Sequence, residues 1–349
     1  MSKLSIHIRR GERTRTLFCL IAAGSAAIST FMAGPARPAV AASSGYQWPV
    51  KPFDQPHPIR GSFGDPRTIF AAPPTEEGLM TGDGTFNFHF GVDIAAPNNT
   101  PVFSVETGTV TVVSTSKGHE YVEVEVGNGR SFQYWHIRPA VRLGQRAEAG
   151  RTVLGAVMAP REHVHFAELQ RGRVVNPLVR GHLTPYVDTT RPDVASISLR
   201  RTETGSALFA NNVGGRVVMV AEAYDTRQLR IPGAWQSMPV APARVMWRLQ
   251  TVGGKLAARG VAADFRRTTP PNGSFWSYYA RGTYQNMSVF GSRYSWGQPG
   301  RFLFKLTRSA FNTSSVPDGI YDLVVTASDI RGNKSSSALR LTIHNRAGW

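Results

Sequence analysis

Short stretches containing histidine stand out because their side chains bind metal ions or move protons. The first stretch, residues 88–94, contains His89 and Asp93 four positions apart. The second ends in His136, and the third contains His163 and His165. Imidazole and carboxylate groups are common zinc ligands, and a catalytic zinc site takes three protein ligands and keeps one position open. We therefore expect the stretches to meet in one metal centre.

The set of His89, Asp93 and His165 supplies three ligands for Zn²⁺. One carboxylate against a dication leaves a net positive centre, which lowers the pKa of water and polarises a carbonyl group. His163 and His165 are two positions apart, so on a strand they share one face, and one can bind metal while the other reaches a substrate. His136 shares its expected strand face with Tyr134, and its imidazole can take a proton or stabilise an oxyanion there.

Each stretch alone also has an ordinary structural interpretation. A single His–Asp pair at this spacing is usually a surface hydrogen bond. Tyr134 either binds a substrate oxyanion or packs in the sheet, and we favour packing. Asn87 and Arg161 either line a groove or belong to solvated loops. The other histidines have no patterned partners and are interpreted as structural or solvent-exposed, among them His57, His119 and His182.

The motifs H-x-G-x-D-I at His89, Tyr-x-His at His136 and H-x-H-F at His163 occur together and in this order. In order and spacing the sequence resembles lysostaphin/LytM-type zinc metallopeptidases, a peptidoglycan endopeptidase family, over residues 55–180. The resemblance implies that His89, Asp93 and His165 bind Zn²⁺ and that His136 and His163 assist catalysis. It also implies an antiparallel β-sheet core with an open groove, and peptidoglycan as the substrate.

Two positions depart from the pattern of that family. Residues 159–162 read Ala-Pro-Arg-Glu where a glycine-containing loop usually precedes H-x-H. Ala167 stands where an acidic residue usually follows His-Phe, and Glu168 comes next. The first departure alters a wall of the groove and with it the expected substrate preference. Neither departure removes a ligand.

The elements that must position these residues are short β-strands. Val122, Val124 and Val126 alternate with glutamates, an Asn128-Gly129 turn follows, and residues 131–137 alternate again. An Asn-Gly turn between alternating runs is typical of a β-hairpin. Few segments show a helical period, so we expect a mainly β fold. Its first part is an antiparallel β-sheet metallopeptidase domain at residues 42–180.

After a proline-containing linker at residues 181–192, the strand pattern restarts. It predicts an immunoglobulin-like β-sandwich domain over residues 193–349, with alternating runs at 194–199, 216–224, 244–249, 301–306, 319–327 and 337–343. The last two runs resemble the final hairpin of immunoglobulin-like or fibronectin-like domains. The aromatic residues from Phe275 to Trp296 either pack as a local core or stack on wall glycans, and we favour packing.

Residues 1–41 are typical of a secretory signal peptide. Five basic residues precede an apolar run from Leu17 to Gly34, and Ala39-Val40-Ala41 fits a cleavage site. An uncleaved membrane anchor is the alternative, which several polar residues within the run disfavour. Cleavage would leave a soluble protein, secreted to the periplasm or to the cell wall and extracellular space. It would also remove Cys19, the only cysteine, so a metal site must use histidine and carboxylate.

The charge balance points to polyanionic partners. The 349 residues carry a formal net charge of +17, and the excess of basic residues persists after residue 41. Such a surface attracts polyanions, which outside the cytoplasm are cell-wall polymers and lipid headgroups. Nucleic acid is not expected as a partner, because no nucleic-acid motif accompanies the charge.

The leading hypothesis from the sequence is a secreted zinc metallo-endopeptidase that hydrolyses peptide bonds of peptidoglycan stems or cross-bridges. One alternative is a metalloprotease that acts on extracellular Gly-rich proteins. Another is a non-catalytic cell-wall-binding or amidase-regulating protein, which the complete set of ligands disfavours.

Overall fold

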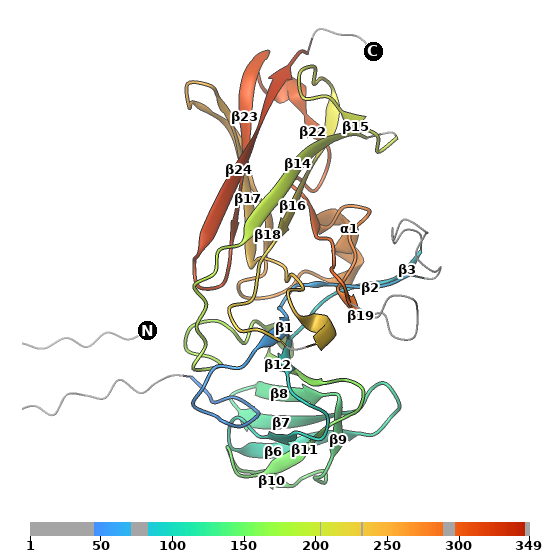
Figure 1. Ribbon diagram of the computed structural model, residues 1–349, viewed down its shortest axis with the longest axis vertical. Helices are drawn as coiled ribbons and strands as arrows, with labels where there is room; N and C mark the ends of the chain where they lie inside the picture. Colours follow the sequence, from blue (N-terminus) through green and yellow to red (C-terminus); the bar gives the residue numbers. More distant parts are fainter. Residues whose placement is uncertain (1–44, 71–82, 203, 232, 289–296, 346–349) are drawn as a thin grey trace, which may run out of the picture. The chain divides into compact units, whose positions relative to one another are not determined.

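The computed structural model describes residues 45–70, 83–202, 204–231, 233–288 and 297–345, which belong to one compact unit (Figure 1). The predicted signal peptide, residues 1–41, lies outside the described residues, as do Phe290, Tyr294 and Trp296. The fold is mainly β, as expected, and neighbouring strands of every sheet are antiparallel. Within the described ranges, no helix is long and apolar enough to cross a membrane.

The three histidine-containing stretches belong to, or directly adjoin, one eight-stranded sheet. Its strands in spatial order are β1 (Ile59–Gly61), β4 (Val92–Ala95), β12 (His163–Gln170), β8 (Arg130–Trp135), β7 (Tyr121–Gly127), β6 (Gly108–Ser114) and β10 (Arg146–Ala147), with β13 (Arg173–Val175) paired to β12. Although β4 and β12 are far apart in the sequence, they are hydrogen-bonded neighbours. This pairing brings the first and third stretches together.

The predicted hairpin is confirmed as β7 and β8. Gly127 pairs with Arg130, so Asn128 and Gly129 form a two-residue turn, and both adopt a positive φ. Asn and Gly tolerate this left-handed backbone conformation, which the tight hairpin turn requires. The alternating residues Val122 and Val124 of β7 are fully buried in the core. Because the valine side chains cover the core face of the sheet, functional side chains must project from the opposite face.

Smaller sheets complete the N-terminal region, by which we mean residues 45–180. One sheet has the order β5 (Pro101–Phe103), β11 (Val153–Val157), β9 (Ile137–Pro139). A separate two-stranded ribbon pairs β2 (Pro66–Phe70) with β3 (Gly84–Phe88). Because β3 ends at Phe88, the ribbon leads directly into His89.

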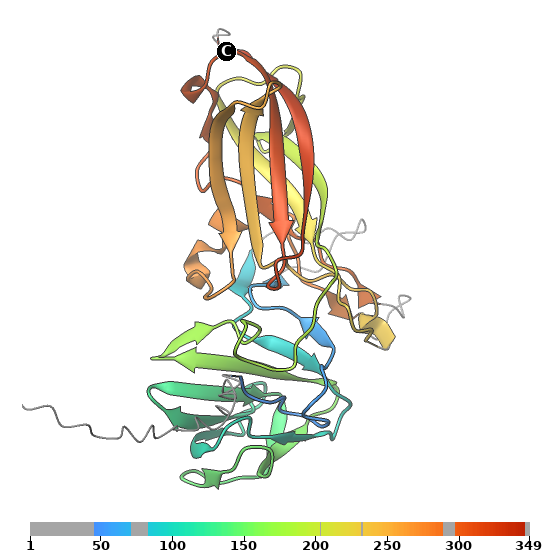
Figure 2. The same cartoon turned by 90° about the vertical axis from the view of Figure 1, so that its left-hand side faces the viewer.

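The C-terminal region, residues 193–345, contains two larger antiparallel sheets. One has the order β15 (Ala207–Leu208), β14 (Asp193–Arg201), β16 (Arg216–Tyr224), β21 (Leu303–Lys305), with β22 (Phe311–Asn312) also paired to β16. The other has the order β18 (Leu256–Asp264), β17 (Arg244–Thr251), β23 (Gly319–Ser328), β24 (Lys334–Ile343) (Figure 2). Met219 of the first sheet and Leu249 and Leu341 of the second line one small apolar cavity, so the sheets share a core.

All six predicted runs of the C-terminal region coincide with strands of these sheets. The prediction missed β18, whose residues are mostly small or charged and largely exposed at the edge of its sheet. The immunoglobulin-like character of the region, and the division of the chain at residues 181–192, stay predictions.

Short elements of the C-terminal region lie between the larger strands. They are η1 (Gly233–Trp235), η2 (Asn272–Ser274), α1 (Phe275–Tyr278), β19 (Met287–Ser288), β20 (Gly297–Gln298) and η3 (Thr313–Ser315). Phe275 and Tyr279 are fully buried and pack against Phe88 at the end of β3. The packing interpretation of these two aromatic residues is therefore confirmed.

Hydrogen bonds also connect the two regions. The Phe88 amide donates to Asn272 Oδ1 at 3.0 Å. Thr68 of β2 exchanges two hydrogen bonds with Gln285, at 3.2 and 3.0 Å. The Tyr279 hydroxyl donates to the Gly64 carbonyl at 2.8 Å. The C-terminal region thus holds the ribbon and the turn that precede the first histidine.

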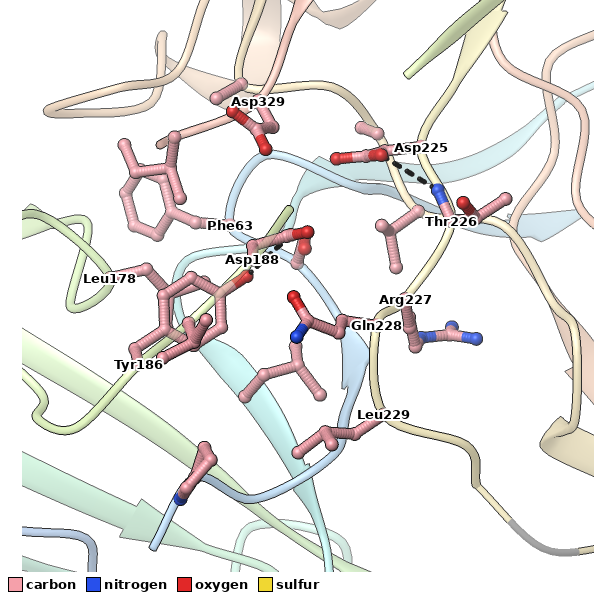
Figure 3. A pocket seen from close by; sticks show the side chains of 18 of the residues that line it. Phe63, Leu178, Tyr186, Asp188, Asp225, Thr226, Arg227, Gln228, Leu229 and Asp329 are labelled. Carbon is pink, nitrogen blue, oxygen red and sulfur yellow. Dashed lines mark hydrogen bonds between the residues drawn. The ribbon is translucent and has the colours of Figure 1, made fainter. Parts of the chain in front are cut away.

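A small cavity of about 40 Å³ is lined by residues of both regions (Figure 3). Three carboxylates, which we call the acidic cluster, converge beside it: Asp188, Asp225 and Asp329. Asp329 accepts hydrogen bonds from three backbone amides, and Asp188 accepts from Tyr186 and Thr190. Burial, and then the neighbouring Asp188 and Asp329, raise the pKa of Asp225 to about 8.

Candidate metal centre and groove

Strand register brings the candidate site residues onto one face of the sheet. His165 of β12 lies directly opposite Asp93 of β4 on one side and Trp135 of β8 on the other. Side chains that are directly opposite across antiparallel strands project from the same face. Val164 and Phe166, which alternate with the histidines, are fully buried in the core. The expectation that His163 and His165 share a face is confirmed.

Three potential ligand atoms converge at this face. His89 Nε2 lies 2.7 Å from His165 Nδ1, and each of these nitrogens lies 3.1 Å from Asp93 Oδ1. The three residues are buried, with exposed fractions of 2% for His89, 8% for Asp93 and 4% for His165. The structure therefore brings together all three residues that were expected to bind metal.

The backbone fixes the tautomer of His89. Its Nδ1 lies 2.7 Å from the Ser62 carbonyl, which can only accept, so Nδ1 carries the proton and Nε2 presents a lone pair. Ser62 belongs to a turn that Asp65 closes by accepting from the Ser62 amide at 2.8 Å. Asp65 in turn accepts from the Ala241 amide of the C-terminal region at 2.6 Å.

These donor atoms fit a zinc ion. The lone pair of His89 Nε2, the carboxylate Oδ1 of Asp93 and Nδ1 of His165 face one another, and at most one proton can lie between them. His165 Nε2 is buried without a hydrogen-bond partner among the described residues, which leaves Nδ1 as the nitrogen that faces the cluster. Tetrahedral zinc with bonds of about 2.0–2.2 Å places its ligands about 3.3 Å apart, close to the spacing found here.

The electrostatics suit metal binding as well. Burial, and then the nearby Arg67, lower the pKa of His89 to about 4, so the imidazole is neutral at pH 7. Burial alone would raise the pKa of Asp93, but His89, Arg67 and His163 outweigh it, and the pKa lies well below its ordinary value. Neutral imidazole and ionised carboxylate are the protonation states that bind metal.

Arg67 lies directly behind Asp93. Its Nη2 donates to Asp93 Oδ2 at 2.6 Å and leaves Oδ1 toward the two histidines. The same guanidinium lies 3.7 Å from Asp65. A second partner of this kind orients a carboxylate ligand and fixes which oxygen faces the metal.

His163 lies beside the three converging atoms. Its Nδ1 donates to the Arg161 carbonyl at 2.6 Å, which leaves the Nε2 lone pair 3.6 Å from Asp93 Oδ1. Burial lowers its pKa well below the ordinary value. His163 is therefore a neutral base whose free nitrogen points into the site.

His136 also reaches the site, but by a different route from the one expected. Its ring centroid lies 4.7 Å from that of His163. The prediction that it shares a strand face with Tyr134 is wrong: β8 ends at Trp135, and His136 adopts a φ of +64°. Tyr134 points into the core, so this backbone reversal, rather than strand alternation, turns His136 toward the groove. Burial lowers its pKa to about 3.

Tyr134 has a packing role, as favoured. It is fully buried, and its hydroxyl oxygen accepts a hydrogen bond from the Val105 amide at 2.9 Å. Glu168, the displaced acid after His-Phe, also points away from the site. It accepts from the Tyr46 hydroxyl and pairs with His182, both at 2.6 Å.

A groove of about 480 Å³ runs over the five site residues. Asn87 and Arg161, for which a place in the groove or in a solvated loop was left open, both line it. Sequence reasoning missed several other lining residues: Arg60, Arg67, His119, Trp135, Trp235, Asn272, Gln285 and Asn286. Four of these come from the C-terminal region, and no sequence motif connects them with the histidines.

Comparison with known proteins gives a match in the N-terminal region. Residues 87–177 match the model of Peptidase family M23. The peptidoglycan DD-endopeptidase ShyA of Vibrio cholerae serotype O1 is 28% identical over 125 residues, which are 33% of this chain and 28% of that protein. The match therefore spans little more than a quarter of the length of that relative.

Solved structures also match part of the chain. The catalytic domain of the antimicrobial peptidase lysostaphin from Staphylococcus simulans matches at 18% identity, covering 34% of this chain and 86% of that one, with a TM-score of 0.25. A zinc-containing peptidase from Vibrio cholerae matches at 23% identity, covering 36% and 40%, with a TM-score of 0.24. Over residues 87–177, which include all five candidate site residues, the chain is thus similar to Peptidase family M23.

Proposed function

We propose that this protein is a secreted zinc metallo-endopeptidase that hydrolyses peptide bonds in the stems or cross-bridges of bacterial peptidoglycan. The observation that carries the proposal is the convergence of His89 Nε2, Asp93 Oδ1 and His165 Nδ1 within 3.1 Å of one another on the floor of an open groove. The match to Peptidase family M23 and the similarity to a peptidoglycan DD-endopeptidase support it.

In this proposal His89, Asp93 and His165 hold Zn²⁺. The ion supplies Lewis-acid chemistry, because it lowers the pKa of water and polarises a substrate carbonyl. Arg67 keeps the Asp93 carboxylate in place, and the Ser62 carbonyl keeps His89 in the tautomer that can bind.

His163 and His136 have the catalytic roles. His163 is held by the Arg161 carbonyl with its Nε2 lone pair toward the site, so it accepts a proton from water during the attack. His136 stacks edge-to-face on His163 and stabilises charge that develops on the substrate oxygen. Both imidazoles are neutral at pH 7, as a proton acceptor must be.

The assignment of the whole chain is part of the same proposal. Residues 1–41 serve as a signal peptide, residues 42–180 form the metallopeptidase domain, and a linker at residues 181–192 precedes an immunoglobulin-like domain at residues 193–349. The family match lies wholly within the proposed catalytic domain. Fractionation of the host cells tests export: protein that stays in the cytoplasm with residues 1–41 intact would contradict it.

The enzymatic role is tested by measuring zinc content and the release of peptides from purified sacculi. The wild-type protein should carry about one zinc ion, the number a catalytic site of three protein ligands holds. His89→Ala and Asp93→Ala should lack the metal and the activity. His344→Ala is the matched control, because His344 is exposed and distant in sequence from the site. Full hydrolysis by either site variant would refute the proposal.

The substrate is tested separately from the chemistry. Gly-rich extracellular proteins such as elastin are offered beside sacculi to the same zinc-loaded preparation. Cleavage of the Gly-rich protein alone would select the alternative metalloprotease. Binding to sacculi without cleavage of either substrate would select the non-catalytic alternative.

A further inference from the structure

Arg60 is a groove residue without a carboxylate in direct contact. It lies on β1, and its guanidinium lines the groove over the metal centre. Among the residues that the structure describes, no carboxylate lies within ion-pair distance of it, and its Nε is buried without a hydrogen-bond partner. A largely desolvated cation without an ion-pair partner is unfavourable in the free protein, so it indicates an anionic ligand.

Arg67, on β2, the next strand in the sequence, differs from Arg60 in its ion pairs. Its guanidinium lies 2.6 Å from Asp93 and 3.7 Å from Asp65, so two carboxylates already compensate its charge. Both arginines line the same groove. Of these two arginines, only Arg60 has no ion pair among the described residues.

The guanidinium of Arg60 is held in place from two sides. Its central carbon lies 3.6 Å from the ring centroid of Trp235, which is a stacking contact, and its Nη1 donates to the Arg161 carbonyl at 2.8 Å. Stacking on an aromatic ring and a fixed hydrogen bond leave the flat group little rotational freedom. Little entropy is therefore lost when a ligand binds to it.

Arg227 holds the backbones of Arg60 and Trp235 together. It donates hydrogen bonds to the carbonyls of Arg60, Trp235 and Met238. It thereby ties the η1 turn of the C-terminal region to the backbone of β1. The position of the Trp235 ring over Arg60 is thus built into the fold.

The position of Arg60 relative to the catalytic residues is equally defined. The Arg161 carbonyl accepts from both Arg60 Nη1 at 2.8 Å and His163 Nδ1 at 2.6 Å. One carbonyl oxygen thus links the Arg60 guanidinium to the proposed proton acceptor, His163. A group bound by Arg60 would lie next to the bond that is cut.

We propose that Arg60, stacked on Trp235, binds a carboxylate of the peptide substrate beside the scissile bond and makes the groove selective for peptides that carry one. This inference rests on the proposed peptidase function and specifies its substrate class. A guanidinium fits a carboxylate because two parallel N–H groups meet its two oxygens. A carboxamide has the same shape but lacks the charge, so it is the matched comparison.

The experiment uses the purified chain loaded with Zn²⁺ and two soluble synthetic substrates. One is a cross-linked peptidoglycan stem-peptide dimer with free side-chain carboxyl groups, and the other is the same dimer with those groups converted to carboxamides. We expect kcat/KM to be at least about tenfold higher for the free-carboxyl dimer, the size of effect that one charge-assisted hydrogen bond supplies. Calorimetry with the zinc-free protein should show tighter binding of that dimer.

Variants then assign the preference to the residues. Arg60→Gln should bring the ratio of the two kcat/KM values close to one, mainly by raising KM for the free-carboxyl dimer. Arg60→Lys should restore part of the preference, and Trp235→Ala should weaken it. Arg142→Gln is the control: it removes the same charge from an exposed loop position and should leave the ratio unchanged. Zinc content measured on every variant verifies that the metal centre is intact.

Equal kcat/KM values and equal binding of the two dimers by the wild-type protein would overturn the inference and leave the peptidase function standing. A wild-type preference that Arg60→Gln and Arg60→Lys both retain in full would overturn it too. Failure to cleave either dimer, or sacculi, would remove the proposed function and the inference together.

Discussion

Two clusters of potential metal ligands in this chain differ in how their acceptor atoms are satisfied. At the metal centre, His89 Nε2, His165 Nδ1 and Asp93 Oδ1 face one another, and the groove above them is about 480 Å³. In the acidic cluster, backbone amides and hydroxyl groups already occupy oxygens of Asp188 and Asp329, and the adjoining cavity is about 40 Å³.

We infer from this comparison that only the first cluster is a metal site, although both contain ligand-type residues in proximity. The first cluster combines the neutral imidazole of His89 with an ionised Asp93, which is the protonation state that a metal site requires. The second has three carboxylates, and burial beside its neighbours raises the pKa of Asp225 to about 8, so a proton reduces the repulsion there. Four predictions test this distinction.

The largest effect is expected from loss of a ligand. His165→Ala should remove bound zinc and lower sacculus hydrolysis by more than about a hundredfold, which is the upper end for loss of a partner outside the ligand set. Asp225→Asn in the acidic cluster should leave zinc content and hydrolysis near wild type. Metal analysis and peptide release measure both, and loss of zinc from the Asp225→Asn protein would break the distinction.

Removal of zinc should lower the free energy of unfolding, because zinc binds at His89, Asp93 and His165 and not at the acidic cluster. Zinc in thousandfold excess over its Kd stabilises the folded chain by about 4 kcal/mol, so EDTA should lower the unfolding temperature of the wild-type protein. The His89→Ala protein should show no such shift. Calcium added to the chelated protein should not raise its unfolding temperature, and a rise would show that the acidic cluster binds a cation after all.

A smaller effect is expected from crowding Asp93. A Cβ at Gly61 would lie 2.5 Å from both Asp93 Oδ2 and Arg67 Nη2, so Gly61→Ala must displace the carboxylate or its partner. We expect zinc affinity to fall by about 10- to 100-fold, as for other outer-shell changes. Competition with a zinc-binding dye measures the affinity. Gly253→Ala, at an exposed position outside the groove where a Cβ meets nothing closer than 4.0 Å, reports the effect of an added methyl group alone.

The smallest effect concerns pH and the acidic cluster. The folded-state pKa of Asp225, about 8, exceeds the ordinary value of 3.8, so its contribution to stability is full at acid pH and is lost as the pH rises toward 8. The loss is at most about 1.4 kcal/mol per pH unit. Asp225→Asn should remove that slope in denaturant titrations between pH 5 and 9. Asp83→Asn, at an exposed position, should retain it.

The sequence predicts the local parts of the site well. The Asn128-Gly129 hairpin, the shared face of His163 and His165 and the six C-terminal runs depend on short-range patterns, and the structure contains them. The three expected ligand residues also come together, because β4 and β12 are neighbouring strands in matching register. Their roles as ligands stay a proposal.

The features of the site that depend on long-range contacts could not be predicted from the sequence. His136 reaches the groove through a backbone reversal at φ +64°, and strand periodicity cannot anticipate a break at its last residue. Trp235, Asn272 and Gln285 line the groove because the C-terminal region packs against β1 and the β2–β3 ribbon. Contacts of this kind depend on tertiary packing and leave no spacing pattern in one chain.

The contacts at Phe88 bear on how this protein could be re-engineered. Its ring packs among Phe265, Phe275 and Tyr279, and its amide donates to Asn272 one residue before His89. A chimera that grafts residues 45–180 onto a foreign targeting module would expose these aromatic surfaces to water and release the strand that presents His89. Residues 45–180 should therefore not be transferred alone, and an engineered protein should keep the N-terminal and C-terminal regions together.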